Sequence, residues 1–296
     1  MANNRDISRL HNTGDDDFSF SIPGLSRFRI NAYKQRGSLA AVIRVIAFQL
    51  PDPAELSIPE DVMSIANLTK GMVLVTGSAG SGKSTTMACL IDRINHSREG
   101  HIITLEDPLE YLHRHDRCIV SQREICTDTE NYITSLRATL RQSPDVILLG
   151  EMRDYETSQT AMTAAETGHL VLSSLHTTGA ANTIGRIVDV FEPSQQRQVS
   201  IQLSMVLQAV ISQQLVPDVE GHNIPVFEVM RLNPAIRNMI RDNKVHQIDG
   251  VISSSAHEGM RSMDQSLLEL FRQNRITKET ALKYAANADM LKRKLL

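Results

Sequence analysis

The stretch that decides the fold is Gly71-Met-Val-Leu-Val-Thr-Gly-Ser-Ala-Gly-Ser-Gly-Lys-Ser-Thr-Thr86. It opens with the apolar run of a buried strand, continues as a glycine-rich loop, and ends where helical spacing begins. Gly77, Gly82, Lys83 and Ser84 satisfy the spacing G-x-x-x-x-G-K-[ST], which is typical of a loop that wraps nucleotide phosphates. Glycine is needed because the backbone N–H groups must come close to phosphate oxygens, and larger side chains would block that approach.

The loop predicts how a nucleoside triphosphate and Mg²⁺ are held. Lys83 is expected to reach the β- and γ-phosphates, and the Ser84 hydroxyl is expected to ligate Mg²⁺. The start of the following helix adds its partial positive charge. A solvated glycine loop is the plain alternative, which the flanking strand and helix disfavour. The residues expected to contact the phosphates are Gly77, Ser78, Ala79, Gly80, Ser81, Gly82, Lys83, Ser84 and Thr85.

Composition limits the class of protein. The 31 Lys and Arg against 34 Asp and Glu give a formal charge of −3, and Trp is absent, so neither a basic field nor stacking platforms favour nucleic acid. No run approaches the roughly 18 apolar residues of a membrane span, and Met1–Gly14 lacks the apolar core of a signal peptide. We therefore expect a soluble cytoplasmic protein. Cys89, Cys118 and Cys126 lack C-x-x-C spacing and indicate reduced structural thiols rather than zinc ligands.

Residues 1–52 are expected to form a small α+β unit. Met1–Asp17 is polar and is expected to be loop, whereas Phe18–Ile22, Arg27–Tyr33 and Ala40–Ile46 have the pattern of short strands. Three strands alone form a poor core, so this unit is either completed by other elements or incomplete.

The chain changes character after Leu50-Pro-Asp-Pro53, which marks a domain boundary. Residues 53–70 are expected to be a linker with a short helix at Pro59–Asn67. From residue 71 to residue 296 the pattern alternates strands with helices, which is typical of a parallel sheet with helical crossovers. The sequence therefore predicts an α/β domain over 71–296.

Acidic residues follow two of the predicted strands. The strand His101–Leu105 is followed by Glu106, and the apolar strand Val146–Leu149 is followed by Glu151. The carboxyl ends of parallel strands share the sheet edge where ligands bind. Both carboxylates are thus expected near the phosphate loop, with Glu151 holding Mg²⁺ through water.

Two histidines flank the next strand. His169 precedes it and His176 follows it, so an extended strand places them roughly 23 Å apart and excludes a shared metal. His176 lies at the ligand edge among hydroxyls and is the candidate for contact with the γ-phosphate. His169 is expected to be structural.

The remaining chain is predicted to be mostly helical, with two short strands around Leu215 and Val226. The expected helices are Thr129–Gln142, Tyr155–Thr167, Ala180–Val190, Ser194–Ile211, Pro234–Arg241, Val245–Ser254, Met263–Gln273 and Lys278–Ala286, followed by a basic end at Lys292–Lys294.

Four stretches together resemble the Walker A, Asp box, Walker B and His box of secretion ATPases, the motors of type II secretion and type IV pili. They are Gly77–Thr85, Ile103–Glu110, Asp145–Asp154 and Ala164–Thr178, in the family's order. Within the family, Ala235-Ile-Arg-Asn-Met-Ile-Arg-Asp242 resembles a segment of PilT-type retraction motors. The four-cysteine zinc module usual in assembly motors has no counterpart here. Both features favour retraction.

The resemblance implies a RecA-like P-loop NTPase domain preceded by a PAS-like α+β domain, with ATP and Mg²⁺ between them. It implies a homohexameric ring at the inner face of the cell membrane, attached only through an inner-membrane platform protein. The ring would hydrolyse ATP to drive type IV pilus retraction and twitching motility, without binding nucleic acid. The family's N-terminal domain normally begins several dozen residues earlier, so we expect the first half of the PAS-like domain to be missing.

The resemblance also implies residue roles. Glu106 matches the carboxylate that orients the attacking water, Glu151 the Walker B residue on Mg²⁺, and His176 a γ-phosphate sensor, with Lys83 completing the catalytic set. A group of arginines matches the region that supplies positive charge to a neighbour's phosphates. These arginines are Arg29, Arg36 and Arg44.

Two departures stand beside this interpretation, together with three alternatives, one of which is a nucleotide-binding partner with little turnover. The loop reads Gly-Ser-Ala-Gly where Gly-Pro-Thr-Gly is usual, and Ser143 stands where an acidic residue is common. A pilus assembly or type II secretion ATPase is the nearest alternative function. A DNA-dependent RecA-like motor is less favoured, because the chain is acidic and has no Trp.

Overall fold

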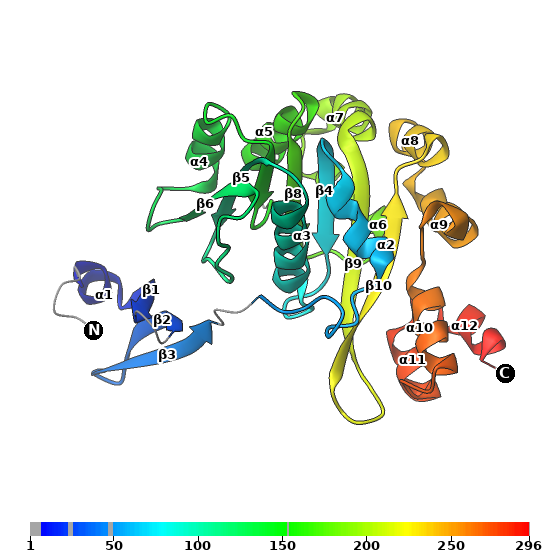
Figure 1. The fold of residues 1–296 in the computed structure, drawn as a ribbon, viewed down its shortest axis with the longest axis horizontal. Coiled ribbons are helices and arrows are strands. Elements are labelled where there is room, and N and C mark those ends of the chain that lie inside the picture. Colours follow the sequence, from blue (N-terminus) through cyan, green and yellow to red (C-terminus); the bar gives the residue numbers. More distant parts are fainter. Residues whose placement is uncertain (1–6, 23–25, 47–49, 153, 296) are drawn as a thin grey trace.

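The computed structural model describes residues 7–22, 26–46, 50–152 and 154–295. Residues 1–6, 23–25 and 47–49 of the predicted N-terminal unit lie outside the described residues. The described part forms a three-stranded and a seven-stranded sheet (Figure 1). The strands are β1 (Asp15–Ile22), β2 (Ser26–Gln35), β3 (Ser38–Ile46), β4 (Gly71–Thr76), β5 (Gly100–Glu106), β6 (Cys118–Glu124), β7 (Val146–Leu149), β8 (Leu170–Leu175), β9 (Leu207–Pro217) and β10 (Asn223–Arg231).

The large sheet has the order β10-β9-β4-β8-β7-β5-β6. All of its neighbouring pairs are parallel except β9 with β10. Every residue of β4, β7 and β8 is buried, as expected for parallel strands covered on both faces. The predicted α/β fold with a mostly parallel sheet is therefore confirmed.

Helices cover both faces of this sheet (Figure 1). Met72 and Leu74 of β4 face one core, whereas Val73 and Val75 face the other, because side chains alternate along a strand. The helices are α1 (Ser8–Thr13), α2 (Glu60–Met63), α3 (Lys83–Ser97), α4 (Tyr132–Thr139), α5 (Tyr155–Glu166), α6 (Ala180–Asp189), α7 (Pro193–Val206), α8 (Pro234–Arg241), α9 (Ile248–Ser254), α10 (Met263–Arg272), α11 (Lys278–Tyr284) and α12 (Ala288–Lys294), with short 3₁₀ turns η1 (Ser64–Asn67), η2 (Val245–Gln247) and η3 (Ala256–Glu258).

The two cores contain different helices. Helices α4–α9 pack on one face of the sheet, and α2, η1 and α3 pack on the other. A third apolar cluster joins α10–α12 to the outer part of the β9–β10 hairpin. Among the described residues, no helix combines the length and apolar character needed to span a bilayer.

The prediction for Ser194–Ile211 was wrong. Helix α7 ends at Val206, and the chain continues as β9, which pairs with both β4 and β10. Leu203, Val206, Leu207, Val210 and Ile211 follow helical spacing although a helix end and a strand share them. The strand forms because β9 is buried between two partners, and its apolar residues then point to both faces of the sheet.

The N-terminal end of the chain also differs from prediction. Ser8–Thr13 forms helix α1, which ends at Gly14 in the left-handed conformation, where loop was expected. Strand β1 begins at Asp15 because Asp15 pairs with Tyr33 on β2. The basic end is helix α12, whose start is capped by Asn287.

The three predicted N-terminal strands are present and form an antiparallel sheet beside β6 (Figure 1). Arg27 of β2 is ion-paired with the buried carboxylate of Glu124 at the end of β6. Most of β3 is exposed, including Val42 and Val45. The small sheet therefore has little core of its own, as the sequence indicated.

Candidate functional site

The loop between β4 and α3 requires glycine at two positions. Gly77 has φ +146° and Gly82 has φ +90°, a region of backbone space that other residues rarely adopt. A Cβ on Gly77 would lie 2.2 Å from the backbone carbonyl oxygen of Gln213, and one on Gly82 would lie 2.8 Å from the side-chain Nε2 of Gln213. Strand β9 therefore holds the loop from beneath.

Gly77→Ala is expected to abolish nucleotide binding and to destabilise the fold by several kcal/mol, because strain and a backbone clash act together. Gly80→Ala is the matched control. Gly80 has φ +76°, but a Cβ added there would have no neighbour within 4 Å, so this variant should cost only about 1 kcal/mol. Urea unfolding and fluorescent-nucleotide binding measure both effects. Equal losses of unfolding free energy in the two variants would contradict the close approach of Gln213.

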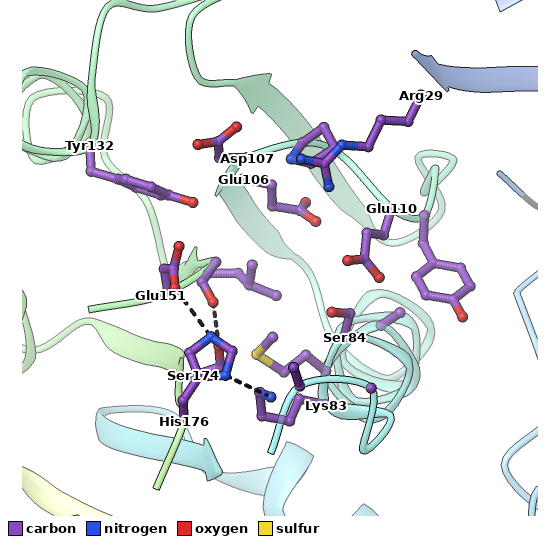
Figure 2. Close-up of a pocket in the computed structure, with 18 of the residues that line it drawn as sticks. Arg29, Lys83, Ser84, Glu106, Asp107, Glu110, Tyr132, Glu151, Ser174 and His176 are labelled. Atoms are coloured by element: carbon purple, nitrogen blue, oxygen red, sulfur yellow. Dashed lines mark hydrogen bonds and ion pairs between the residues drawn. The ribbon is translucent and has the colours of Figure 1, made fainter. Parts of the chain in front are cut away.

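A cavity of about 320 Å³ opens above this loop, at the carboxyl ends of the parallel strands (Figure 2). It brings together Lys83 and Ser84 from the start of α3, Glu106 from the end of β5, Glu151 after β7, and His176 after β8. These five predicted residues come from four separate stretches of the chain. Their convergence follows from the parallel strand directions.

Lys83 and His176 lie at one side of the cavity (Figure 2). The Lys83 Nζ donates hydrogen bonds to the carbonyl oxygens of Gly77 and Ser78, at 2.9 and 2.8 Å. It also lies 3.5 Å from Nδ1 of His176, whose Nε2 lies 3.5 Å from a Glu151 oxygen. Burial lowers the pKa of Lys83, while nearby carboxylates of Glu110 and Glu151 oppose that shift.

Glu106 lies across the cavity from Lys83 (Figure 2). The residue is partly exposed, and it lines the cavity. Burial raises the pKa of the Glu106 carboxyl from 4.5 to about 7. Glu106 can therefore accept a proton near neutral pH, which is the property a general base needs.

Gly150 and Glu151 are fixed from both sides. The Gly150 N–H donates to the Leu105 carbonyl of β5 at 2.8 Å, and its own carbonyl accepts from the Ser174 hydroxyl of β8. A Cβ on Gly150 would lie 2.7 Å from the Tyr132 hydroxyl oxygen. This backbone holds the Glu151 carboxylate at the cavity wall.

The three predicted arginines lie in different places. Arg29 of β2 lines the cavity and is paired with Asp17 at 3.0 Å. Arg44 of β3 lines a smaller hollow beside it, shared with Arg29 and Tyr111. Arg36 lies exposed in the β2–β3 turn and does not line the cavity.

The remaining loop residues fit a phosphate cradle. Ala79 and Gly80 line the cavity, Thr85 is hydrogen-bonded to Tyr111 at 2.8 Å, and Ser78 is exposed at the loop's crest. The Ser81 hydroxyl is buried without a hydrogen-bond partner among the described residues. A cationic amine, hydroxyls and backbone held close by glycine are the groups that suit a triphosphate with Mg²⁺.

Several cavity residues were not predicted as site residues. Asp107 and Glu110 belong to a quoted motif, so the motif could have identified them. Tyr132 opens α4 and Ser174 lies inside β8, and no local pattern marks either. His169 lies at the opposite end of β8, where its Nδ1 is 2.9 Å from the Ala164 carbonyl oxygen, in agreement with a structural role.

Comparison with known proteins gives the family. Residues 5–260 match the family model described as type II/IV secretion system protein. The chain is 46% identical over 276 residues to a twitching motility protein of Neisseria gonorrhoeae, covering 93% of the chain and 74% of the relative. It is 45% identical over 267 residues to the type IV pilus retractation ATPase PilT of Pseudomonas aeruginosa, covering 90% and 78%.

A crystal structure of the pilus retraction motor PilT with bound ADP superposes with a TM-score of 0.92 at 45% identity, covering 99% of this chain and 83% of that one. The predictions of the family and of an ATPase are thereby confirmed. The chain belongs to the type II/IV secretion system protein family.

Proposed function

We propose that this chain is an ATPase motor that drives type IV pilus retraction. The observation that carries the proposal is the meeting of Lys83, Glu106, Glu151 and His176 in one cavity. This cavity belongs to a chain that superposes over 99% of its length on the retraction motor PilT with bound ADP. The segment Ala235–Asp242 also favours retraction over assembly or type II secretion.

Each residue has a proposed task at the triphosphate. Lys83 turns from the loop carbonyls to the β- and γ-phosphates, and backbone N–H groups of Gly77–Thr85 surround them. Ser84 and, through water, Glu151 hold Mg²⁺, which neutralises phosphate charge when bound. His176, held between Lys83 and Glu151, contacts the γ-phosphate.

Glu106 is proposed to orient the attacking water and to take its proton. A base with a pKa near 7 combines a substantial ionised fraction at neutral pH with useful proton affinity. Arg29 is proposed to act on phosphates bound in its own chain because it lines the cavity, whereas Arg36 and Arg44 are proposed to reach a neighbour's phosphates.

The wider arrangement follows the same proposal. Residues 71–296 form a RecA-like domain, residues 53–70 a linker, and residues 1–52 belong to a PAS-like domain. The chain works as a homohexamer in the cytoplasm, held at the inner face of the membrane by a platform protein.

Steady-state phosphate release from the purified chain tests the enzymatic part of this proposal, and deletion of the gene tests the direction of the motor. Loss of a retraction motor should leave cells over-piliated and without twitching motility. Bald cells would instead show an assembly motor, and DNA-stimulated turnover would favour a DNA-dependent motor.

A further inference from the structure

A buried carboxylate on β10, Glu228, contacts the starts of two helices. Its side chain lies within the protein, with 7% of the residue exposed. Oε1 accepts a hydrogen bond from the Ala180 N–H at the start of α6, at 2.9 Å, and Oε2 accepts a longer one from the Met263 N–H at the start of α10, at 3.5 Å. Burial raises the pKa of Glu228, and these two N–H donors oppose the shift. One carboxyl group thus joins the starts of α6 and α10, which are 83 residues apart in the sequence.

The first of these helices follows the nucleotide cavity directly. His176 lines the cavity, and α6 begins at Ala180, four residues later in the sequence. Between them, the Gly179 N–H donates to the Ser212 hydroxyl at 2.9 Å, and Ser212 is the direct partner of Glu228 across the β9–β10 ladder. A displacement of the His176 segment would therefore also displace the Gly179 and Ala180 N–H groups, which are hydrogen-bonded to Ser212 and Glu228.

The second helix leads into the C-terminal cluster. Met263 is buried in the apolar group that joins α10–α12 to the β9–β10 hairpin. The start of α10 already has its own cap, because Ser262 and Gln265 exchange hydrogen bonds there. These bonds use the N–H groups of Ser262 and Gln265, whereas the Met263 N–H is bonded to Glu228, so this contact both completes the cap and links α10 to α6.

A cavity of about 800 Å³ lies beside this link. Its walls include the start of α6, helix α9 through Asp249, the start of α10, and α12 through Met290. Figure 1 shows α10–α12 grouped at one end of the molecule, attached beside β10. The open volume leaves room for this group to shift against α6, whereas a filled core would resist such movement.

We propose that Glu228 is a positioning residue that transmits the nucleotide state sensed at His176 to helices α10–α12. The proposal rests on the proposed function, which makes His176 a phosphate contact. When the His176 segment closes on a γ-phosphate, the Ala180 N–H moves with it. The Glu228 carboxylate can keep its hydrogen bonds to both N–H groups only if Met263 and the apolar cluster of α10–α12 move in the same direction.

Glu228→Gln tests this link with almost no change of shape. An amide has one acceptor oxygen, and its NH₂ group cannot accept from an N–H, so one helix start loses its partner whichever way the amide is oriented. The matched control is Ser266→Ala, which removes the hydrogen bond from the buried Ser266 hydroxyl of α10 to the Phe227 carbonyl but keeps Glu228.

The measurement is hydrogen–deuterium exchange of the full chain with Mg²⁺ and either ADP or a non-hydrolysable ATP analogue. In the wild type and in Ser266→Ala, exchange at 177–189 and at 263–294 should both differ between the two nucleotides. In Glu228→Gln the difference should persist at 177–189 and fall at least threefold at 263–294. A purely structural role would change exchange equally with either nucleotide.

Two outcomes overturn the proposal: an unchanged nucleotide-dependent difference at 263–294 in Glu228→Gln, or no such difference in the wild type. Failure of the proposed function is recognised separately, because it appears as absent ATP turnover or wild-type pilus retraction after gene deletion. If hydrogen–deuterium exchange shows the predicted Glu228-dependent coupling in a chain that does not hydrolyse ATP, the Glu228 link is supported and the proposed ATPase function is not.

Discussion

Lys83→Ala is expected to lower kcat/KM for ATP at least about 100-fold, since it removes a cation aimed at developing phosphate charge in a sheltered cavity. The Nζ lies within 2.9 Å of two loop carbonyls, so the amine is already held beside the phosphate loop before nucleotide binds. Binding of ADP should weaken as well, because the β-phosphate loses the same partner. Phosphate release and isothermal titration calorimetry measure the two effects.

The control is Lys70→Ala, which removes an exposed lysine just before β4. It changes net charge by the same amount but leaves the cavity intact, and turnover should stay within about twofold of the wild type. Circular dichroism should show that both variants fold. Full ATP turnover in Lys83→Ala would show that the Gly77–Thr85 loop does not bind the phosphates through Lys83, and the proposed mechanism would then be wrong.

The loop and the two acidic strand ends could be predicted because each is encoded locally. The spacing from Gly77 to Ser84 specifies a strand, a tight loop and a helix start within one stretch. Glu106 and Glu151 directly follow apolar strands, and parallel strands bring their carboxyl ends to one edge. Local pattern and the general rule for α/β sheets were sufficient for these residues.

Other parts of the site depend on contacts distant in sequence. Which arginine lines the cavity depends on how β2 lies beside β6, where Arg27 is ion-paired with Glu124 and Arg29 lines the cavity. Gln213 supports the loop from a strand whose apolar spacing resembled a helix. No local pattern distinguishes these positions, since pairing register and burial arise only in the folded sheet.

Glu106→Gln is expected to lower kcat about 10²–10³-fold with KM for ATP nearly unchanged, because a general base acts in the transition state. In the wild type, kcat/KM should rise as pH increases through about 7, where Glu106 loses its proton, and the variant should lack this rise. Glu110→Gln, which neutralises an exposed carboxylate in the same cavity, is the control and should retain most turnover. Equal losses in both variants would show only a general charge effect.

The same substitution should stabilise the nucleotide-free protein, in a pH-dependent way. The folded-state pKa of Glu106 is raised from 4.5 to about 7, so folding disfavours the ionised form. Below the unfolded value of 4.5 both states carry the proton, and Glu106 costs no stability. As pH rises from 4.5 to 7 the unfolded state ionises first, so the cost grows and is complete above about 7.

Glutamine never ionises and escapes this cost. The melting temperature of Glu106→Gln should therefore equal that of the wild type near pH 4.5 and exceed it at pH 8. Differential scanning calorimetry without nucleotide measures the difference. If the variant melts with the wild type at both pH values, the Glu106 carboxylate is ionised and well solvated at neutral pH, and its role as a base tuned by burial is wrong. If the melting difference and the activity profile change over the same pH range, the titration of Glu106 accounts for both. The burial that makes Glu106 a proton acceptor near neutral pH then also lowers the stability of the nucleotide-free protein.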